Sequence, residues 1–90
     1  MSTWRVEFSD EAARDFLRLD RAVRVQVDDR IAWLAYNFDH ITPLPLHEDL
    51  TGHYKLRAGD WRVVYTVERS EKILKIREIK HRNKVYKHRK

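Results

Sequence analysis

The fold is decided by one stretch, His53-Tyr-Lys-Leu-Arg-Ala-Gly-Asp-Trp-Arg-Val-Val-Tyr-Thr-Val67. Apolar residues alternate with charged or small ones on both sides of Ala58-Gly-Asp60. Because successive side chains of a strand point to opposite faces, each half predicts a strand with one buried face, and the central glycine predicts a tight turn. We expect strands over His53–Arg57, Trp61–Val67 and Ile73–Ile79, arranged as an antiparallel meander.

The segment before this stretch begins with a strand and a helix. Thr3–Phe8 alternates large apolar and charged residues, which predicts a strand with one buried face. Ser9, followed by two acids, is typical of a helix N-cap and first turn. We expect the first helix to present Ala13, Phe16 and Leu17 on one face.

A longer helix follows, with Asp20 as its expected N-cap. Its apolar residues recur at steps of four, four, three and four, at Val23, Val27, Ile31, Leu34 and Phe38. This spacing places them in one stripe along about four helical turns. The stripe predicts a helical hairpin packed on one face of the sheet, with Trp33 either partly exposed or facing a partner.

Two segments lack a regular pattern. Between Asp39 and Gly52 the periodicity lapses, and Thr42-Pro-Leu-Pro45 excludes regular helix because proline fixes φ and lacks an amide donor, so we expect a loop. The last residues, His81–Lys90, predict a basic tail or a short helix. The whole pattern predicts a single α+β domain over residues 1–90, in the order β-α-α-β-β-β.

The composition limits the classes of function. With 90 residues, 42% hydrophobic, and only two Gly and two Pro, the chain is typical of one ordered domain. The absence of cysteine excludes disulfides and a thiolate nucleophile, and no metal or other cofactor is expected. No apolar run approaches the roughly 20 residues of a membrane span, and the N-terminus does not resemble a signal peptide, so we expect a cytoplasmic protein.

The charge is divided unevenly along the chain. Residues 1–52 carry six Arg, no Lys and ten acids, a net charge of −4, whereas residues 53–90 carry thirteen Lys or Arg and four acids, a net charge of +9. One-sided basic charge commonly marks a surface that faces a polyanion, because Lys and Arg neutralise phosphates and release counterions. A solvated basic tail or a surface for an acidic partner protein would have the same charge.

The basic part holds a candidate site for a phosphodiester. Attack of an RNA 2′-hydroxyl on its adjacent phosphate needs a base, charge stabilisation and an acid. Lys55 and Arg57 alternate along one strand and so share a face, which Arg62 on the next strand joins if the register permits. In such a cluster each positive charge favours loss of a proton by its neighbour, which makes Lys55 the candidate general base.

Three motifs occur together in this part of the chain, Tyr54-Lys-Leu-Arg57, Gly59-Asp-Trp-Arg-Val-Val-Tyr65 and His81-Arg-Asn-Lys-Val-Tyr86. With the strand and helical hairpin before them, they resemble the RelE family of bacterial and archaeal toxins, within the RelE/ParE superfamily of type II toxin-antitoxin systems. The resemblance covers essentially the whole chain. It implies a ribonuclease-like fold that enters the ribosomal A site and cleaves mRNA there, and a cognate antitoxin that covers the basic surface.

The resemblance also implies roles for residues near the C-terminus. Arg82 would stabilise the phosphate or the leaving oxygen, and Tyr86 would stack on a splayed base. The general acid stays open, because RelE-like sites use Arg whereas other superfamily members pair a C-terminal His with a Glu from the loop before the second strand. In this chain that His would be His81, with Glu48 or His47 as its partner.

Purely structural roles stay open for the same residues. His81 could be a strand-end histidine hydrogen-bonded to the backbone, and Tyr86 could pack on the core. The two arginines of the cluster could form ion pairs, for instance with Asp60 or Glu78.

The other basic residues are expected to steer the protein toward ribosomal RNA. They are Lys75, Arg77, Lys80, Lys84, Lys87, Arg89 and Lys90. Two rival functions remain. One is a ParE-like inhibitor of DNA gyrase, against which the full set of candidate catalytic residues argues. The other is a non-catalytic module that binds RNA or an antitoxin.

Overall fold

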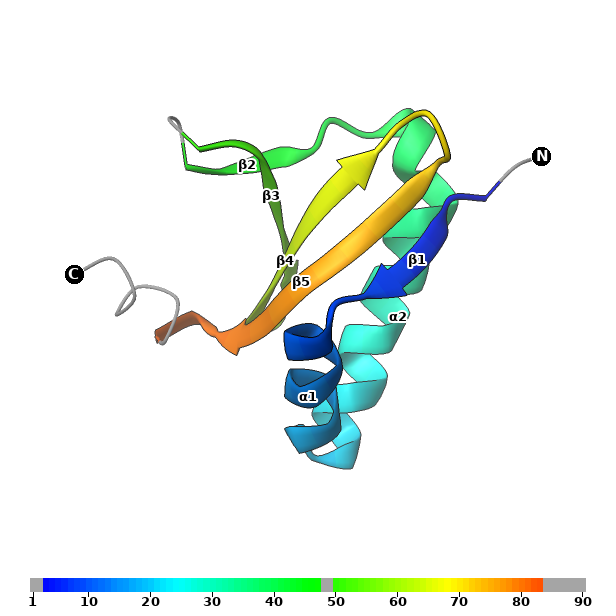
Figure 1. Cartoon of the computed structure of the whole chain (residues 1–90). Coiled ribbons are helices and arrows are strands. Elements are labelled where there is room, and N and C mark those ends of the chain that lie inside the picture. The colour runs from blue at the N-terminus through cyan, green and yellow to red at the C-terminus, as the bar shows by residue number, and fades with distance from the viewer. Residues whose placement is uncertain (1–2, 48–49, 84–90) are drawn as a thin grey trace.

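The computed structural model describes residues 3–47 and 50–83 (Figure 1). Its elements are, in chain order, β1 (Arg5–Phe8), α1 (Asp10–Arg18), α2 (Arg21–Asn37), the 3-10 helix η1 (Phe38–His40), β2 (Leu44–His47), β3 (Leu50–Ala58), β4 (Trp61–Glu68) and β5 (Ile73–His81). The predicted α+β class and its order of one strand, two helices and three strands are confirmed, and the structure adds β2 and η1.

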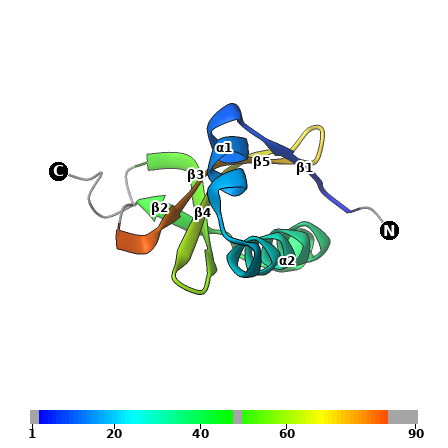
Figure 2. The same cartoon turned by 90° about the horizontal axis from the view of Figure 1, so that it is seen from below.

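The strands form one mixed sheet in the order β1-β5-β4-β3-β2. The meander of β3, β4 and β5 is antiparallel as predicted, while β1 pairs in parallel with β5 from Ile73 to Ile76. The turn between β3 and β4 has Gly59 at a φ of +61°, which glycine adopts without steric cost. Seen from below in Figure 2, α2 lies to one side of the sheet and α1 lies beside β5.

The core lies between α2 and the sheet. Asp20 caps α2 as predicted, because its Oδ1 accepts a hydrogen bond of 3.0 Å from the Val23 amide. The predicted stripe faces the core: Val23 is partly buried, and Val27, Ile31 and Leu34 are 0%, 4% and 1% exposed. Trp33 on the other side of the helix is 42% exposed, as expected.

The buried face of α1 differs from the prediction. Leu17, which was expected to face the core, is 71% exposed, whereas Ala12 and Asp15 are buried. The expected face of Ala13, Phe16 and Leu17 is therefore wrong at Leu17. The helix is turned so that a carboxylate, and not a leucine, faces the sheet.

The physical reason lies at the edge of β5. Because β1 pairs with β5 only as far as Ile76, the following residues of β5 need other hydrogen-bond partners. Asp15 supplies them: its Oδ2 accepts from the Ile79 amide at 2.9 Å and its Oδ1 accepts from Lys80 Nζ at 3.0 Å. Ser9, the predicted N-cap of α1, donates its hydroxyl to the Arg77 carbonyl at 2.9 Å.

The predicted loop between Asp39 and Gly52 is also corrected. It contains η1 and the edge strand β2, and β3 begins at Leu50 instead of His53. Pro45 is compatible with β2 because, among the described strands, β2 lies at the edge of the sheet and pairs with β3 alone. Proline excluded a helix here, as argued from the sequence, but it did not exclude an edge strand.

The predicted basic tail at the C-terminus stays a prediction. Residues 84–90, most of the expected basic tail, lie outside the described part of the chain. Within the described part, none of the helices has the length and apolar character needed to cross a membrane.

Candidate functional site

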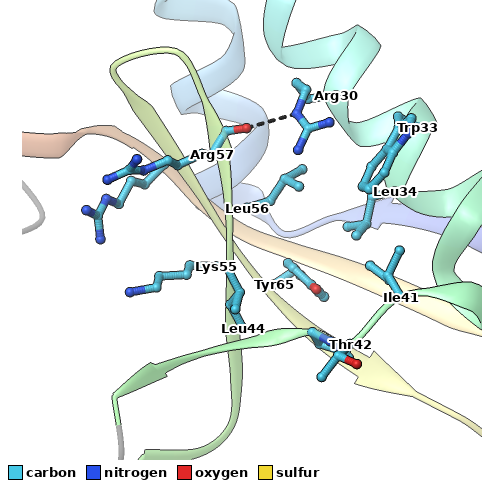
Figure 3. Close-up of a pocket in the computed structure, with 12 residues that line it drawn as sticks. Arg30, Trp33, Leu34, Ile41, Thr42, Leu44, Lys55, Leu56, Arg57 and Tyr65 are labelled. Atoms are coloured by element: carbon cyan, nitrogen blue, oxygen red, sulfur yellow. Dashed lines mark hydrogen bonds between the residues drawn. The ribbon is translucent and has the colours of Figure 1, made fainter.

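The register of the sheet brings three predicted cations together. Arg57 of β3 and Arg62 of β4 are directly opposite each other, and Lys55 is opposite Val64. Because alternate residues of a strand share a face, Lys55, Arg57 and Arg62 lie on one face, and we call them the cationic cluster. Figure 3 shows Lys55 and Arg57 pointing away from α2, while Leu56 and Tyr65 point toward it.

The three cations differ in exposure. Arg57 is exposed, Lys55 is half-buried, and Arg62 is only 7% exposed. A buried guanidinium is costly unless neighbouring groups balance its charge. The register places Glu78 of β5 opposite Val64, diagonal to Arg62, so an acid suited to that balance lies on the same face.

Lys80, predicted to steer RNA, is engaged with α1. It lies opposite Arg62 in the sheet, and its Nζ contacts Asp15 Oδ1 at 3.0 Å and Glu11 Oε2 at 3.1 Å. Burial alone would lower the pKa of Lys80, but these hydrogen bonds and the two negative charges outweigh burial and raise the pKa. Lys80 therefore stays protonated and anchors α1 to β5.

His81 does not join the cationic cluster. It is the partner of Trp61 in the β4–β5 register, and their rings meet edge to face with centroids 5.4 Å apart. Its Nδ1 accepts a hydrogen bond of 3.4 Å from the Asn83 amide, which is the backbone-bonded arrangement considered from the sequence. Since Arg62 pairs with Lys80, the neighbouring position His81 faces the opposite side of the sheet.

The other predicted site residues are placed less fully. Arg82 is exposed, and its amide donates to the Asp60 carbonyl at 2.9 Å. Lys75 Nζ lies 3.8 Å from Glu7 Oε1, and Arg77 Nε donates to Thr66 Oγ1 at 3.1 Å. Outside the described residues, or without a described side chain, are His47, Glu48, Lys84, Tyr86, Lys87, Arg89 and Lys90.

A cavity of about 350 Å³ lies on the same sheet face as the cationic cluster. Its floor includes Val64, the direct partner of Lys55. The residues that line it are Ser9, Glu11, Leu46, His53, Val64, Arg77 and Glu78. The sequence reasoning missed His53, although its spacing of two residues from Lys55 and four from Arg57 is the signal that could have found it.

A second cavity, of about 400 Å³, lies between α2 and the β2–β3 hairpin on the helix side of the sheet (Figure 3). The Arg30 guanidinium lies 4.5 Å from the centre of the Trp33 ring, and its Nε donates to the Arg57 carbonyl at 2.9 Å. Lys55, Arg57 and Arg62 also line this cavity, so the cationic cluster borders it, although Lys55 and Arg57 point away from α2 (Figure 3).

Known proteins match both the sequence and the fold of this chain. The family described as the ParE toxin of the type II toxin-antitoxin system parDE matches residues 6–86. The curated toxin RelE of Mycobacterium tuberculosis is 30% identical over 83 residues, which cover 92% of this chain and 86% of the relative.

Solved structures have the same fold. The toxin from the RelBE2 complex of Mycobacterium tuberculosis gives a TM-score of 0.78 at 24% identity, over 91% of this chain and 94% of that one. The archaeal RelE-RelB complex from Pyrococcus horikoshii gives a TM-score of 0.69 at 27% identity, over 90% of this chain and 97% of that one. The isolated E. coli RelE toxin gives a TM-score of 0.73 at 21% identity, over 96% of this chain and 94% of that one.

The family match, the curated relative and the shared fold together define the class. The chain belongs to the ParE toxin family, within the RelE/ParE superfamily of type II toxin-antitoxin systems. The matching family is named for ParE and the curated relative for RelE, so both activities considered from the sequence need a test.

Proposed function

We propose that this protein is an endoribonuclease toxin that enters the ribosomal A site, cuts mRNA and so inhibits translation in the cytoplasm. The observation that supports it is the meeting of Lys55, Arg57 and Arg62 on one face of the sheet. Three neighbouring cations on one sheet face can stabilise the negative charge that a phosphodiester gains as it reacts. Inhibition of gyrase does not require such a cluster.

The reaction is a transesterification within the RNA. The 2′-oxygen bonds to phosphorus while its proton passes to a base, for which Lys55 is the candidate. The bond from phosphorus to the 5′-oxygen then breaks, and that oxygen takes a proton, which leaves a 2′,3′-cyclic phosphate and a 5′-hydroxyl. Arg57 and Arg62 stabilise the charge of the five-coordinate phosphorus, and no metal ion is required.

The residues beyond the cluster keep their proposed roles by resemblance. Arg82 assists at the phosphate or the leaving oxygen, and Tyr86 stacks on a base. Two candidates for the general acid were considered, an arginine and His81. The sheet register does not support His81, because its side chain lies with Trp61 on the face opposite the cationic cluster.

The partner of the free toxin is a cognate antitoxin. The RelBE2 structure from Mycobacterium tuberculosis and the RelE-RelB structure from Pyrococcus horikoshii are toxin-antitoxin complexes. We infer that an antitoxin of this chain covers the basic face, where its acidic groups would compete with RNA for the cationic cluster.

Primer extension on a translated mRNA, with and without ribosomes, tests the proposal. Wild-type protein is expected to cut only when ribosomes are present. Arg57→Ala should reduce the rate by about 10²-fold because the exposed guanidinium no longer stabilises the transition state. Arg62→Lys serves as a second variant because it keeps a charge at the buried position, and Arg14→Ala, exposed on α1, is the matched control.

Gyrase inhibition is the second candidate, favoured by the name of the matching family. In that case the protein would cause DNA breaks in the presence of gyrase, and mRNA would stay intact with ribosomes present. Cutting of mRNA without gyrase-dependent breaks would exclude this alternative.

A further inference from the structure

We propose that His53 is the general acid of the ribonuclease site, and that the cavity it lines seats the nucleoside whose 5′-oxygen leaves. This inference rests on the proposed function, since it assigns a role within the same reaction. It concerns a residue and a cavity that the sequence motifs did not indicate.

The position of His53 follows from the regular pairing of β3. From Tyr54 to Ala58 each residue of β3 pairs in register with β4, without an interruption. His53 directly precedes this run in β3 and lines a cavity with Val64, the partner of Lys55, so His53, Lys55 and Arg57 lie at alternate positions on one face. Adjacent positions of this kind are roughly 7 Å apart, so a phosphate at the cluster and its neighbouring ribose can reach both Lys55 and His53.

The ring of His53 has an unused polar atom. Its Nδ1 is buried and has no hydrogen-bond partner among the residues that the structure describes. Buried polar atoms are usually hydrogen-bonded, and exceptions are found at sites that act on a ligand. Histidine is also the side chain best suited to giving and taking a proton at neutral pH.

The cavity beside His53 has the size and chemistry of a small-molecule subsite. Its volume is about 350 Å³, and it lies within the range of sites that hold drug-sized ligands. Leu46 and Val64 offer apolar surface to the face of a base, while Glu78 and Arg77 offer polar groups to its edge.

Charged groups from three elements surround His53. Glu78 and Arg77 of β5 and Glu11 of α1 line the same cavity, and Lys55 is the next residue on the same face of β3. Acidic and basic side chains thus both face the position that a leaving nucleoside would occupy. With Lys55 as the base, His53 supplies the proton for the 5′-oxygen, and the two proton transfers are balanced.

A sulfur leaving group separates this role from a structural one. In a message whose 5′-oxygen at the cut site is replaced by sulfur, the leaving thiolate needs no proton from an acid. We expect His53→Gln to cut the ordinary message on programmed ribosomes about 10²-fold more slowly than wild type. With the sulfur-substituted message its rate should return to within a few-fold of wild type.

The control uses another histidine of the chain. His40→Gln, at an exposed position in η1, should cut both messages at the wild-type rate. A wild-type rate for His53→Gln on the ordinary message would overturn the inference, as would a defect that persists with sulfur. If wild-type protein cuts neither message, the proposed function itself fails and the role of His53 fails with it.

Discussion

Tyr65 illustrates what burial does to a single ionisable residue. It is 1% exposed, and burial, together with the nearby Tyr54, raises the pKa of its hydroxyl from 10.0 to about 12. The neutral hydroxyl is therefore favoured in the folded protein over the unfolded chain. This contribution to stability is complete below pH 10 and is lost as the pH rises toward 12.

The predicted consequence is a loss of stability in alkali that depends on this hydroxyl. Between pH 10 and pH 12 the free energy of unfolding should fall by roughly 2–3 kcal/mol more in wild type than in Tyr65→Phe. Urea unfolding across this pH range measures the difference. Tyr36→Phe, at a position 66% exposed, should leave the wild-type pH dependence unchanged, and equal curves for wild type and Tyr65→Phe would contradict the account.

Asp15 acts at the scale of the element, because it fixes α1 to β5. Its carboxylate, 6% exposed, accepts from the Ile79 amide and from Lys80. Asp15→Ala leaves both donors without this partner and should lower the free energy of unfolding by about 3 kcal/mol. Urea denaturation checks this against Asp28→Ala, an exposed position of α2, for which a change below about 0.5 kcal/mol is expected.

The β3–β4 turn gives a second prediction at this scale. A Cβ added at Gly59 would lie 2.6 Å from Gln26 Nε2, and the φ of +61° disfavours other residues. Gly59→Ala should therefore cost about 1 kcal/mol from the backbone, plus a part due to Gln26. A double-mutant cycle with Gln26→Ala measures that part, and an equal cost in both backgrounds would show that Gln26 does not resist the methyl group.

These elements show which features of the fold could be predicted. The stripe of α2 and the meander were visible because apolar residues repeat at the helical or strand period. The buried face of α1 could not be predicted in this way, because a buried Asp15 breaks the rule that apolar residues face the core. A bulge opposite Val64 and Tyr65 also places both Ile76 and Ile79 inside, which strict alternation does not predict.

The candidate site was predictable to a similar extent. Lys55 and Arg57 share a face by alternation alone, but their meeting with Arg62 depends on the register of two strands, which the tight turn sets. His53 was missed because its relevance comes from a cavity, and the cavity is built from five separate elements. Residues far apart in the chain leave no local pattern.

At the scale of the whole molecule, the basic C-terminal part should dominate binding to RNA. Single-stranded RNA binding is expected to weaken with salt because phosphate contacts release counterions. Arg57→Ala should reduce the slope of log K against log salt concentration by about 0.7, the value of one phosphate contact, whereas Arg14→Ala should not change it. Fluorescence anisotropy at several salt concentrations measures both slopes, and equal slopes for wild type and Arg57→Ala would remove Arg57 from the RNA contact.

The central claim is that this protein cuts mRNA on the ribosome by attack of the 2′-hydroxyl on its own phosphate. The most direct measurement compares two messages on programmed ribosomes, one ordinary and one with a single 2′-deoxyribose at the cut position. The account predicts that the ordinary message is cut to a 5′-hydroxyl fragment and that the deoxy-substituted message is left intact at that site. Cutting of the deoxy-substituted message at the same position, or a 5′-phosphate on the downstream fragment, would contradict it.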